Sequence, residues 1–218
     1  MSKKALIFDL DGVIVDTAKY HYKAWKKLAN NLGFDFTEEQ NELLKGVSRV
    51  KSLEILLEIG NVTLSDEEKL KVMNEKNEHY LGFITKMEQD EILEGIPEVL
   101  NYLRENKVPF SLGSASKNAR LILTQLNLID LFDAIVDGND VSKAKPDPEV
   151  FLIAADKLKT APENCIVVED AIAGIEAANS AQMTSIGIGD KETLGEADIV
   201  LSSTAELNIE LLEKLLRK

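Results

Sequence analysis

The second half of the chain alternates between short apolar runs and longer segments with helical periodicity. Five apolar runs have the length and composition of buried strands, at 109–115, 134–138, 165–170, 184–189 and 198–202. Apolar residues recurring every three or four positions predict helices at 96–106, 117–128, 148–159, 171–182 and 205–217. Asp147 can cap the third of these helices, and Pro148 fits its first turn. Strands and helices that alternate in this way favour a parallel sheet with helices on both faces.

A further apolar run opens the chain, and a region of different periodicity follows it. Residues 4–11, "KALIFDLD", predict the first strand of the same sheet. Residues from about 16 to 90 carry little strand signal and at least four helical segments. Two of these segments begin with capping boxes, at Thr37 with Gln40 and at Ser65 with Glu68.

These patterns divide the chain into a sheet core, residues 1–15 and 91–218, and a helical cap, residues 16–90. The cap departs from the core and returns to it at one place. We therefore expect it to lie over the carboxyl end of the first strand, as a separate lobe able to hinge.

The composition is that of an ordinary globular protein, with 218 residues of which 44% are apolar and 29% charged. No run reaches the roughly 18 apolar residues of a membrane-spanning helix. The apolar stretch after Lys4 is too short for a secretion signal. Cys165 is the only cysteine, which fits a reducing compartment, and its place in an apolar run favours a packing role. We therefore expect a cytoplasmic protein without a membrane partner.

The net charge of −13 argues against nucleic acid as a partner, because no basic arm or arginine-rich stripe offsets it. The long-range field of such a chain also repels phosphorylated molecules. A small phosphorylated substrate would therefore have to be attracted by a few local cations.

Polar and charged residues follow the predicted strands where each strand ends. In chain order these are Asp9 and Asp11, then Ser114, Ala115 and Ser116, then Lys145, and finally Glu169 and Asp170. Ligands bind beyond the carboxyl ends of open parallel sheets, so these residues are expected to converge. Two carboxylates about 4 Å apart repel by roughly 4 kcal/mol at an effective dielectric near 20, so the cluster needs a cation. An all-oxygen set without clustered His or Cys favours Mg²⁺.

The stretch "DLDG" offers chemistry as well as charge. Asp9 and Asp11 are two residues apart, so in an extended chain they face the same side while Leu10 turns into the core. One carboxylate can attack a phosphoryl group to form an aspartyl phosphate, and the other can move a proton. Gly12 permits a sharp turn that brings backbone N–H groups toward the phosphoryl group. Phosphate esters break slowly unaided, and Lys145 and Mg²⁺ could supply the charge compensation this requires.

Each motif also has an ordinary structural interpretation. An EF-hand calcium loop is excluded for "DLDG", because it needs an oxygen ligand at Val13 and a glutamate at Tyr20. Glu169 and Asp170 alone would suggest a solvated strand end or a helix cap, but beside "DLDG" a metal site is favoured. The two serines of 114–116 could cap the following helix, although a helix N-terminus with two hydroxyls is also a seat for phosphate.

The motifs "DLDG", "SAS", "KAKPDP" and "ED", in this order and with an early helical insert, resemble the haloacid dehalogenase superfamily of phosphotransferases. More narrowly, "FDLDGVIVDTAKYHYKAW", "LKGVSR", "SASKN" and "AKPDP" are similar to its β-phosphoglucomutase family. The resemblance spans almost the whole chain. It implies a Rossmann-like core with an α-helical cap, Mg²⁺ as cofactor, and a reaction that interconverts β-glucose 1-phosphate and glucose 6-phosphate through β-glucose 1,6-bisphosphate.

The resemblance also implies roles for residues of the core. Asp9 would be the phosphorylated nucleophile and Asp11 the general acid and base. The implied metal ligands are Asp9, the backbone carbonyl of Asp11, Glu169 and Asp170. The transferring phosphoryl group would be held by Ser114, the Ala115 amide and Lys145, with Ser116, Lys117 and Asn118 close by. One departure is Ala171, which stands where many relatives have a serine, so a hydroxyl near the metal's water shell is missing.

The predicted cap bears on the choice between a mutase and a phosphatase, since a mutase must exclude water and bind a second phosphate. In "LKGVSR", Ser48 opens a helix whose N-terminal amides, together with Arg49, could seat the phosphate that is not transferred. Taken alone, Lys45 and Arg49 would be solvated surface charges. The resemblance adds Gly46 and Val47 to this loop, and Lys76 as a residue that reaches the sugar.

Thr17 and His21 lie one helical turn apart and could both face the cleft next to Asp11. Zinc is not favoured, because His79 is the only other histidine and no cysteine lies nearby. His21 alone would be read as structural, whereas the resemblance assigns this threonine and histidine to coupling cap closure to the acid and base. Trp25 is expected in the cap core rather than as a sugar platform.

We therefore expect a phosphosugar mutase whose partners are a small phosphorylated sugar and the β-glucose 1,6-bisphosphate intermediate. The nearest alternative is a sugar-phosphate phosphatase on the same scaffold. An alternative from another class is a non-catalytic phosphate sensor, against which the joint presence of both "DLDG" carboxylates, Lys145 and the acidic pair counts. A monomer is expected, because a hinging cap needs free surface.

Overall fold

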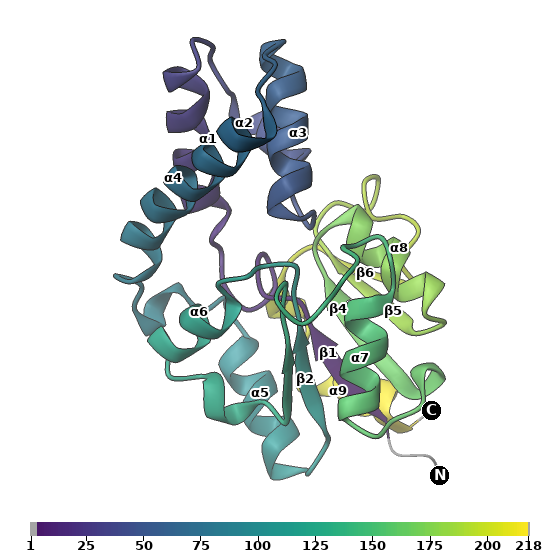
Figure 1. The fold of residues 1–218 in the computed structure, drawn as a ribbon. Coiled ribbons are helices and arrows are strands. Elements are labelled where there is room, and N and C mark those ends of the chain that lie inside the picture. The colour runs from purple at the N-terminus through teal and green to yellow at the C-terminus, as the bar shows by residue number, and fades with distance from the viewer. Residues whose placement is uncertain (1–3, 218) are drawn as a thin grey trace.

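The computed structural model describes residues 4–217; residues 1–3 and 218 of the predicted core lie outside this range. Within it, six strands form one sheet, at β1 (Ala5–Phe8), β2 (Phe110–Gly113), β3 (Ala134–Val136), β4 (Cys165–Glu169), β5 (Thr184–Ile188) and β6 (Ile199–Leu201). The strand order is β3-β2-β1-β4-β5-β6, and every neighbouring pair is parallel (Figure 1). The predicted parallel α/β sheet is confirmed.

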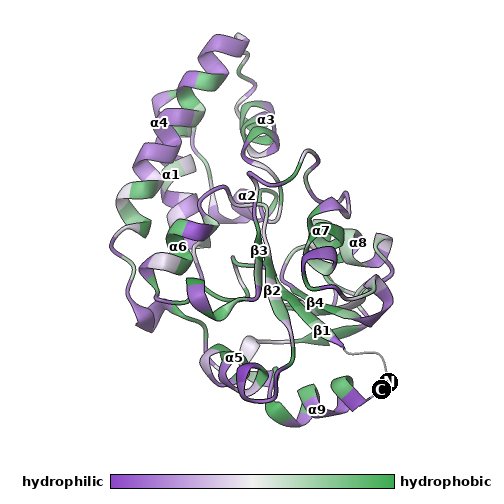
Figure 2. Cartoon of the chain, turned by 60° about the horizontal axis from the view of Figure 1, so that its bottom comes forward, coloured by the Kyte–Doolittle hydropathy of each residue, from purple (hydrophilic) through white to green (hydrophobic). Residues whose placement is uncertain are grey.

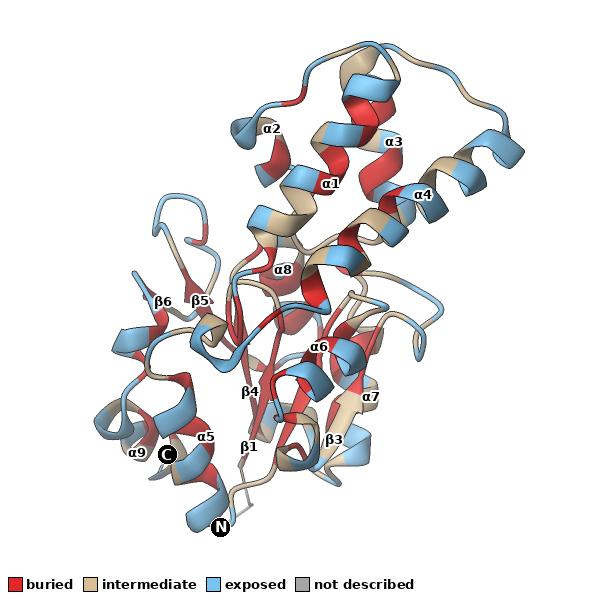
Figure 3. Ribbon diagram, turned by 90° about the vertical axis from the view of Figure 1, so that its left-hand side faces the viewer, coloured by how far each residue is buried: buried red, intermediate tan, exposed pale blue. Residues whose placement is uncertain are grey.

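Helices cover both faces of the sheet, which explains why the strands are unbroken apolar runs. Leu6 and Phe8 of β1 pack with residues of α5 (Ile96–Glu105), α6 (Ala119–Gln125) and α9 (Ile209–Arg217). Ile7, between them, packs with α7 (Glu149–Lys157) and α8 (Ile172–Ser180) on the other face. Figure 2 shows hydrophobic strands between the helices, and in Figure 3 the strands and the inner faces of the helices are buried. β1 therefore lies at the centre of the core.

Several element boundaries differ from the prediction. β1 ends at Phe8, so "DLDG" lies in the loop beyond the strand. Asp147 is not the cap of α7: Pro148 takes the N-cap position, and Asp147 accepts a hydrogen bond from the Glu149 N–H at 3.0 Å. The helix predicted at 205–217 is divided into η4 (Thr204–Glu206) and α9, because Leu207 has a non-helical ψ of 67°. The other short 3₁₀ turns are η1 (Gln89–Glu91), η2 (Ile129–Leu131) and η3 (Pro162–Asn164).

A helical insert follows β1 and stands beyond the carboxyl ends of the strands (Figure 1). Its helices are α1 (Ala18–Asn31), α2 (Glu38–Glu42), α3 (Arg49–Gly60) and α4 (Asp66–Ile84). Both predicted capping boxes, at Thr37 and at Ser65, are present. The insert has an apolar cluster of its own that includes Trp25, Phe36 and Leu56. Trp25 is 2% exposed, which confirms its predicted place in the core of the insert.

Two segments connect the insert to the sheet, and they contact each other. The Leu93 N–H donates to the carbonyl of Ile14 at 2.9 Å. Glu91 accepts from the Tyr20 hydroxyl at 2.6 Å and forms an ion pair with Lys19 at 2.9 Å. The first turn of α1 is thereby tied to the segment by which the chain returns to the core.

Two further properties bear on the sequence predictions. Among residues 4–217, no helix combines the length and the apolar character needed to cross a membrane. Cys165 is fully buried, and burial, with a smaller contribution from Glu163, raises the pKa of its thiol to about 11. The thiol is therefore protonated at neutral pH, in agreement with the predicted packing role.

Candidate active site

A cavity of about 520 Å³ lies between the helical insert and the carboxyl ends of the strands. Both sides supply its lining, with Asp9, Asp11 and Lys145 from the core and His21 and Arg49 from the insert. The other predicted site residues in the lining are Lys45, Gly46, Val47, Ser48, Lys76, Ser114, Ala115, Ser116, Lys117, Asn118 and Asp170. Thr17 and Glu169 are fully buried and lie behind this surface. The topology therefore brings together residues that are widely separated in the sequence.

A buried ammonium lies between two carboxylates at the floor of the cavity. Nζ of Lys145 is 2.6 Å from an oxygen of Asp9 and 2.6 Å from an oxygen of Glu169. Burial alone would lower the pKa of Lys145, but the two carboxylates outweigh it and raise this pKa. Burial, with a smaller contribution from Glu169, outweighs the opposing effect of Lys145 and raises the pKa of Asp9 to about 6. Lys145 is thus a permanent positive charge in contact with Asp9.

Asp11 differs from Asp9 because none of residues 4–217 forms an ion pair with it. Its Oδ1 is buried without a hydrogen-bond partner among residues 4–217. Burial, followed by the neighbouring Asp9, raises the pKa of Asp11 to about 8. Asp11 is therefore largely protonated at neutral pH in the free protein, which suits a group that gives up a proton.

Two glycines allow the acidic loops to approach each other. Gly12 has φ +74°, and a Cβ there would lie 2.1 Å from Oδ2 of Asp170. A Cβ at Gly174 would lie 1.9 Å from Glu169. The Glu169 carboxylate also accepts a hydrogen bond from the Ala171 N–H at 2.8 Å. Glu169 is therefore held by protein donors on both of its oxygens.

The donor set fits a divalent metal ion. Burial and the nearby Glu169 and Asp9 raise the pKa of Asp170 well above its usual range, so negative charge is in excess at this edge of the sheet. Lys145 contacts only one carboxylate oxygen of Asp9, and it forms no hydrogen bond with Asp170. The remaining carboxylate oxygens are hard donors, which suit a divalent cation. Within the described range, no three Asp, Glu, His or Cys side chains are grouped as a complete metal centre. Backbone carbonyls or other oxygens would have to complete the coordination.

The loop at residues 114–118 is braced by its own serines. The buried Ser114 hydroxyl accepts from the Ser116 N–H at 3.1 Å, and the Ser116 hydroxyl accepts from the Asn118 N–H at 3.3 Å. Neither serine is the N-cap of α6, which begins at Ala119 with Asn118 before it. The predicted capping role of these serines is wrong in detail, because they stabilise the turn that precedes the helix.

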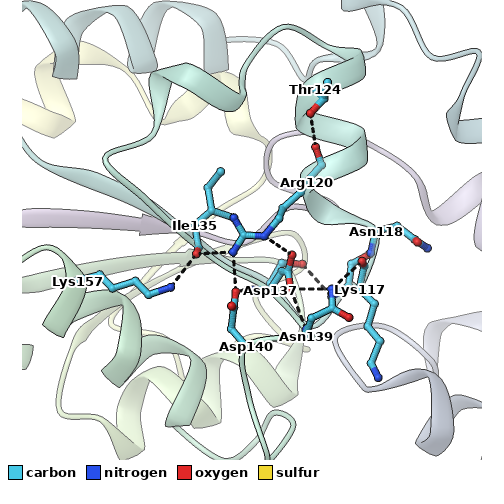
Figure 4. Close-up of polar contacts among 11 residues, drawn as sticks. Lys117, Asn118, Arg120, Thr124, Ile135, Asp137, Asn139, Asp140 and Lys157 are labelled. Atoms are coloured by element: carbon cyan, nitrogen blue, oxygen red, sulfur yellow. Dashed lines mark hydrogen bonds and ion pairs between the residues drawn. The ribbon is translucent and has the colours of Figure 1, made fainter.

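A polar network behind this loop was not found by sequence analysis (Figure 4). Buried Asp137, directly after β3, accepts from the Asn139 backbone at 2.8 Å and from its side chain at 3.0 Å, and pairs with Arg120 at 3.0 Å. Asn139 also donates to the carbonyl of Lys117 at 3.0 Å. A Cβ at Gly138 would lie 2.4 Å from the Ala115 carbonyl. The sequence shows here only a polar run after a strand, which any surface loop shares, so it gave no specific signal.

The insert contributes a buried lysine to the cavity. Lys76 is 4% exposed, and its Nζ lies 2.8 Å from Nδ1 of His21. The same Nζ lies 4.4 Å from the ring centre of Trp25 and 4.9 Å from that of Tyr80. Burial, with repulsion from Arg49, lowers the pKa of Lys76 well below its usual range. Burial, with Lys76 and Arg49, also lowers the pKa of His21 well below its usual range. Hence His21 is neutral and can accept from Lys76.

The loop before α3 touches the core. Ser48 is the N-cap of α3 and accepts from the Lys51 N–H at 3.3 Å, so the predicted helix start is confirmed. Gly46 has φ +69°, and a Cβ there would lie 2.6 Å from Cβ of Ala171. Lys45 pairs with Glu42 at 2.8 Å and also interacts electrostatically with Asp170. Ala171, the residue that departs from the family pattern, therefore lies directly against the loop of the insert at Gly46.

Comparison with known proteins agrees with this architecture. The family model described as haloacid dehalogenase-like hydrolase matches residues 3–182. A β-phosphoglucomutase of Bacillus subtilis (strain 168) is 43% identical over 213 residues, which are 97% of this chain and 94% of that protein. A phosphorylated carbohydrates phosphatase of Thermotoga maritima is 29% identical over 98% of this chain and 100% of that protein. The crystal structure of a β-phosphoglucomutase from Clostridium difficile has a TM-score of 0.94 at 45% identity, over 99% of this chain and 97% of that one. The chain thus belongs to the haloacid dehalogenase-like hydrolase family.

Proposed function

We propose that this protein is a phosphosugar mutase, which interconverts β-glucose 1-phosphate and glucose 6-phosphate through an aspartyl-phosphate enzyme and β-glucose 1,6-bisphosphate. The observation that carries the proposal is a single cavity with cationic side chains on both of its sides. Lys145 lies beside Asp9 on the core, and Arg49 lies on the insert. A bisphosphate needs a cationic side chain for each phosphate, whereas hydrolysis of a monophosphate needs only one. The 43% identity to the B. subtilis β-phosphoglucomutase supports the same conclusion.

Asp9 acts as the nucleophile. Its carboxylate attacks the phosphorus of the bisphosphate, and the bond from phosphorus to the sugar oxygen breaks. Asp11, protonated near neutral pH, gives its proton to the departing sugar oxygen. In the other half-reaction the 6-hydroxyl of β-glucose 1-phosphate attacks the aspartyl phosphate to form the bisphosphate, and Asp11 takes the proton of that hydroxyl. Each transfer conserves the phosphoryl group and one proton.

The core also binds the phosphoryl group that is transferred. Lys145 offsets the charge on the phosphoryl oxygens, and Ser114, the Ala115 amide, Ser116, Lys117 and Asn118 line its binding loop. Asp9 and Asp170, with the carbonyl of Asp11 and the adjacent Glu169, would hold Mg²⁺. When bound, this ion supplies further compensation for the negative charge on the phosphoryl group.

The insert, residues 16–90, acts as a cap over the reaction. Arg49 and Lys45, with Gly46, Val47 and Ser48, bind the phosphate that is not transferred, and Lys76 reaches the sugar. Thr17 and His21 link closure of the cap to Asp11. Closure keeps bulk water away from the aspartyl phosphate. The phosphoryl group is then passed to a sugar hydroxyl, as in a mutase, and not to water, as in a phosphatase. We also propose that the protein works as a cytoplasmic monomer.

One experiment tests the proposed reaction directly. The protein receives β-glucose 1-phosphate, Mg²⁺ and a trace of β-glucose 1,6-bisphosphate, and glucose 6-phosphate and free phosphate are followed in parallel. A mutase converts nearly all of the substrate to glucose 6-phosphate and releases little phosphate. Free phosphate as the main product would instead identify a phosphatase, like the related protein of T. maritima.

A further inference from the structure

Asn77 of α4 connects the insert to the core through a single oxygen. Its side-chain oxygen accepts from a terminal nitrogen of Arg49 at 2.6 Å and from the side-chain nitrogen of Asn118 at 3.0 Å. All three residues line the cavity. Because a guanidinium only donates, the Asn77 atom that faces it has to be the carbonyl oxygen. The Asn118 group that faces the same oxygen therefore has to be its NH₂.

The contact joins the two sides of the cavity at the residues assigned to phosphate. Arg49 begins α3 in the insert, and Asn118 precedes α6 in the core. Two N–H donors from different lobes thus converge on one uncharged oxygen. Convergent donors around one acceptor are also the arrangement that binds a phosphate oxygen.

The acceptor is neutral although it faces a half-buried cation. Within residues 4–217, Arg49 forms no ion pair with an Asp or Glu, and burial lowers the pKa of its guanidinium. An aspartate at position 77 would neutralise Arg49 and compete with an incoming anion. The asparagine satisfies the same donors and leaves the positive charge available.

We propose that Asn77 is a positioning residue which, in the free enzyme, occupies the place of an oxygen of the phosphate that is not transferred. It holds the Arg49 and Asn118 donors together, and the arriving phosphate replaces it and draws both lobes onto one anion. This inference rests on the proposed function, because it concerns the second phosphate of the sugar substrate. Asn77 itself makes no bond to the reacting atoms.

The test compares Asn77→Ala and Asn77→Asp with the wild type, and uses Asn30→Ala as the matched control. Asn30 is an exposed asparagine near the end of α1 in the insert, and it is not part of the cavity lining. Binding of glucose 6-phosphate is measured by calorimetry, and KM and kcat in the mutase assay. We expect Asn77→Ala to weaken binding and raise KM about tenfold with kcat changed less than about threefold. Asn77→Asp is expected to weaken binding about 100-fold, and Asn30→Ala by less than about twofold.

A double mutant separates positioning from a general loss of structure. Once Arg49→Ala has removed one donor, adding Asn77→Ala should change glucose 6-phosphate binding by less than about twofold. Phosphorylation of Asp9 by acetyl phosphate should keep its wild-type rate in Asn77→Ala. Wild-type affinity in both Asn77 variants, or full additivity with Arg49→Ala, would overturn the inference. Calorimetry does not depend on turnover, so a wild type that binds the sugar phosphate but releases free phosphate would contradict the mutase assignment alone.

Discussion

The two walls of the cavity carry opposite kinds of charge and satisfy them in opposite ways. On the core wall the carboxylates are in excess, and one ammonium, Lys145, lies between two of them at 2.6 Å from each. On the insert wall Lys76 and Arg49 are buried or half-buried, and their close polar partners are the neutral groups of His21 and Asn77. The core wall thus raises the pKa of its acids, and the insert wall lowers the pKa of its bases.

The difference shows what each wall lacks. The core wall has unpaired negative charge that a divalent cation can offset. On the insert wall Arg49 has no carboxylate partner among residues 4–217, so an anion can satisfy it. A phosphorylated sugar that arrives with a metal ion supplies both. The charges of the two walls therefore become balanced only when an anionic ligand and a metal ion are present together.

The largest effect is expected from Asp9→Asn on the core wall. The amide is a very poor nucleophile, so no aspartyl phosphate can form, and mutase activity should fall by at least about 10⁴-fold. Intact-protein mass spectrometry after treatment with acetyl phosphate should show no added phosphoryl group. Mutase activity within tenfold of wild type would exclude Asp9 as the nucleophile.

Arg49→Ala tests the insert wall in isolation. Loss of a charge-assisted contact worth about 1.5–3 kcal/mol should raise KM for β-glucose 1-phosphate by about 10- to 100-fold. Acetyl phosphate should still phosphorylate Asp9 at the wild-type rate, because the core wall is intact. Arg104→Ala, at an exposed ion pair with Asp133, is the control and should change neither quantity. An unchanged KM would show that the second phosphate does not bind at Arg49.

The core wall was easier to predict from sequence than the insert wall. Asp9, Lys145 and Asp170 each follow a recognisable apolar run, and parallel topology brings such positions to one edge of the sheet. Asn77 gave no signal, because it lies in the middle of a helix and its partners are 28 residues before it and 41 after it. Only the packing of α3, α4 and the core determines that contact.

Residues behind the site were also beyond the reach of sequence patterns. Asp137 and Asn139 are a polar run after a strand, which is what any surface loop looks like. Their role depends on the Lys117 carbonyl, which belongs to a different loop. Glu169 was predicted as a metal ligand from the acidic pair that it forms with Asp170. The sequence could not reveal that protein donors already engage both carboxylate oxygens of Glu169.

Asn139→Ala perturbs the core wall and leaves the insert wall unchanged. Removing its hydrogen bond to the Lys117 carbonyl makes the loop at residues 114–118 more mobile, and this loop binds the transferring phosphoryl group. We expect kcat to fall about tenfold with KM changed less than about threefold, because misplacement affects the transition state more than ground-state binding. Asn106→Ala is the control, since Asn106 makes a similar bond to the Tyr102 carbonyl at the remote end of α5. A rise in KM without a change in kcat would contradict this assignment.

The smallest effect is expected from Lys76→Met, measured as thermal stability of the free protein. Lys76 faces His21, Arg49 and Asp11, and burial lowers its pKa far below the usual value near 10.5. The unfolded chain binds the proton more tightly than the folded one, so this lysine destabilises the fold increasingly as pH falls below 10.5. Lys76→Met should therefore raise the melting temperature at pH 7 by about 3 °C, and the gain should shrink toward pH 10. Exposed Lys71→Met on the same helix should change it by less than about 1 °C at either pH. A gain that grows with pH would mean that Lys76 is charged and stabilised in the free protein, and the contrast between the two walls would fail.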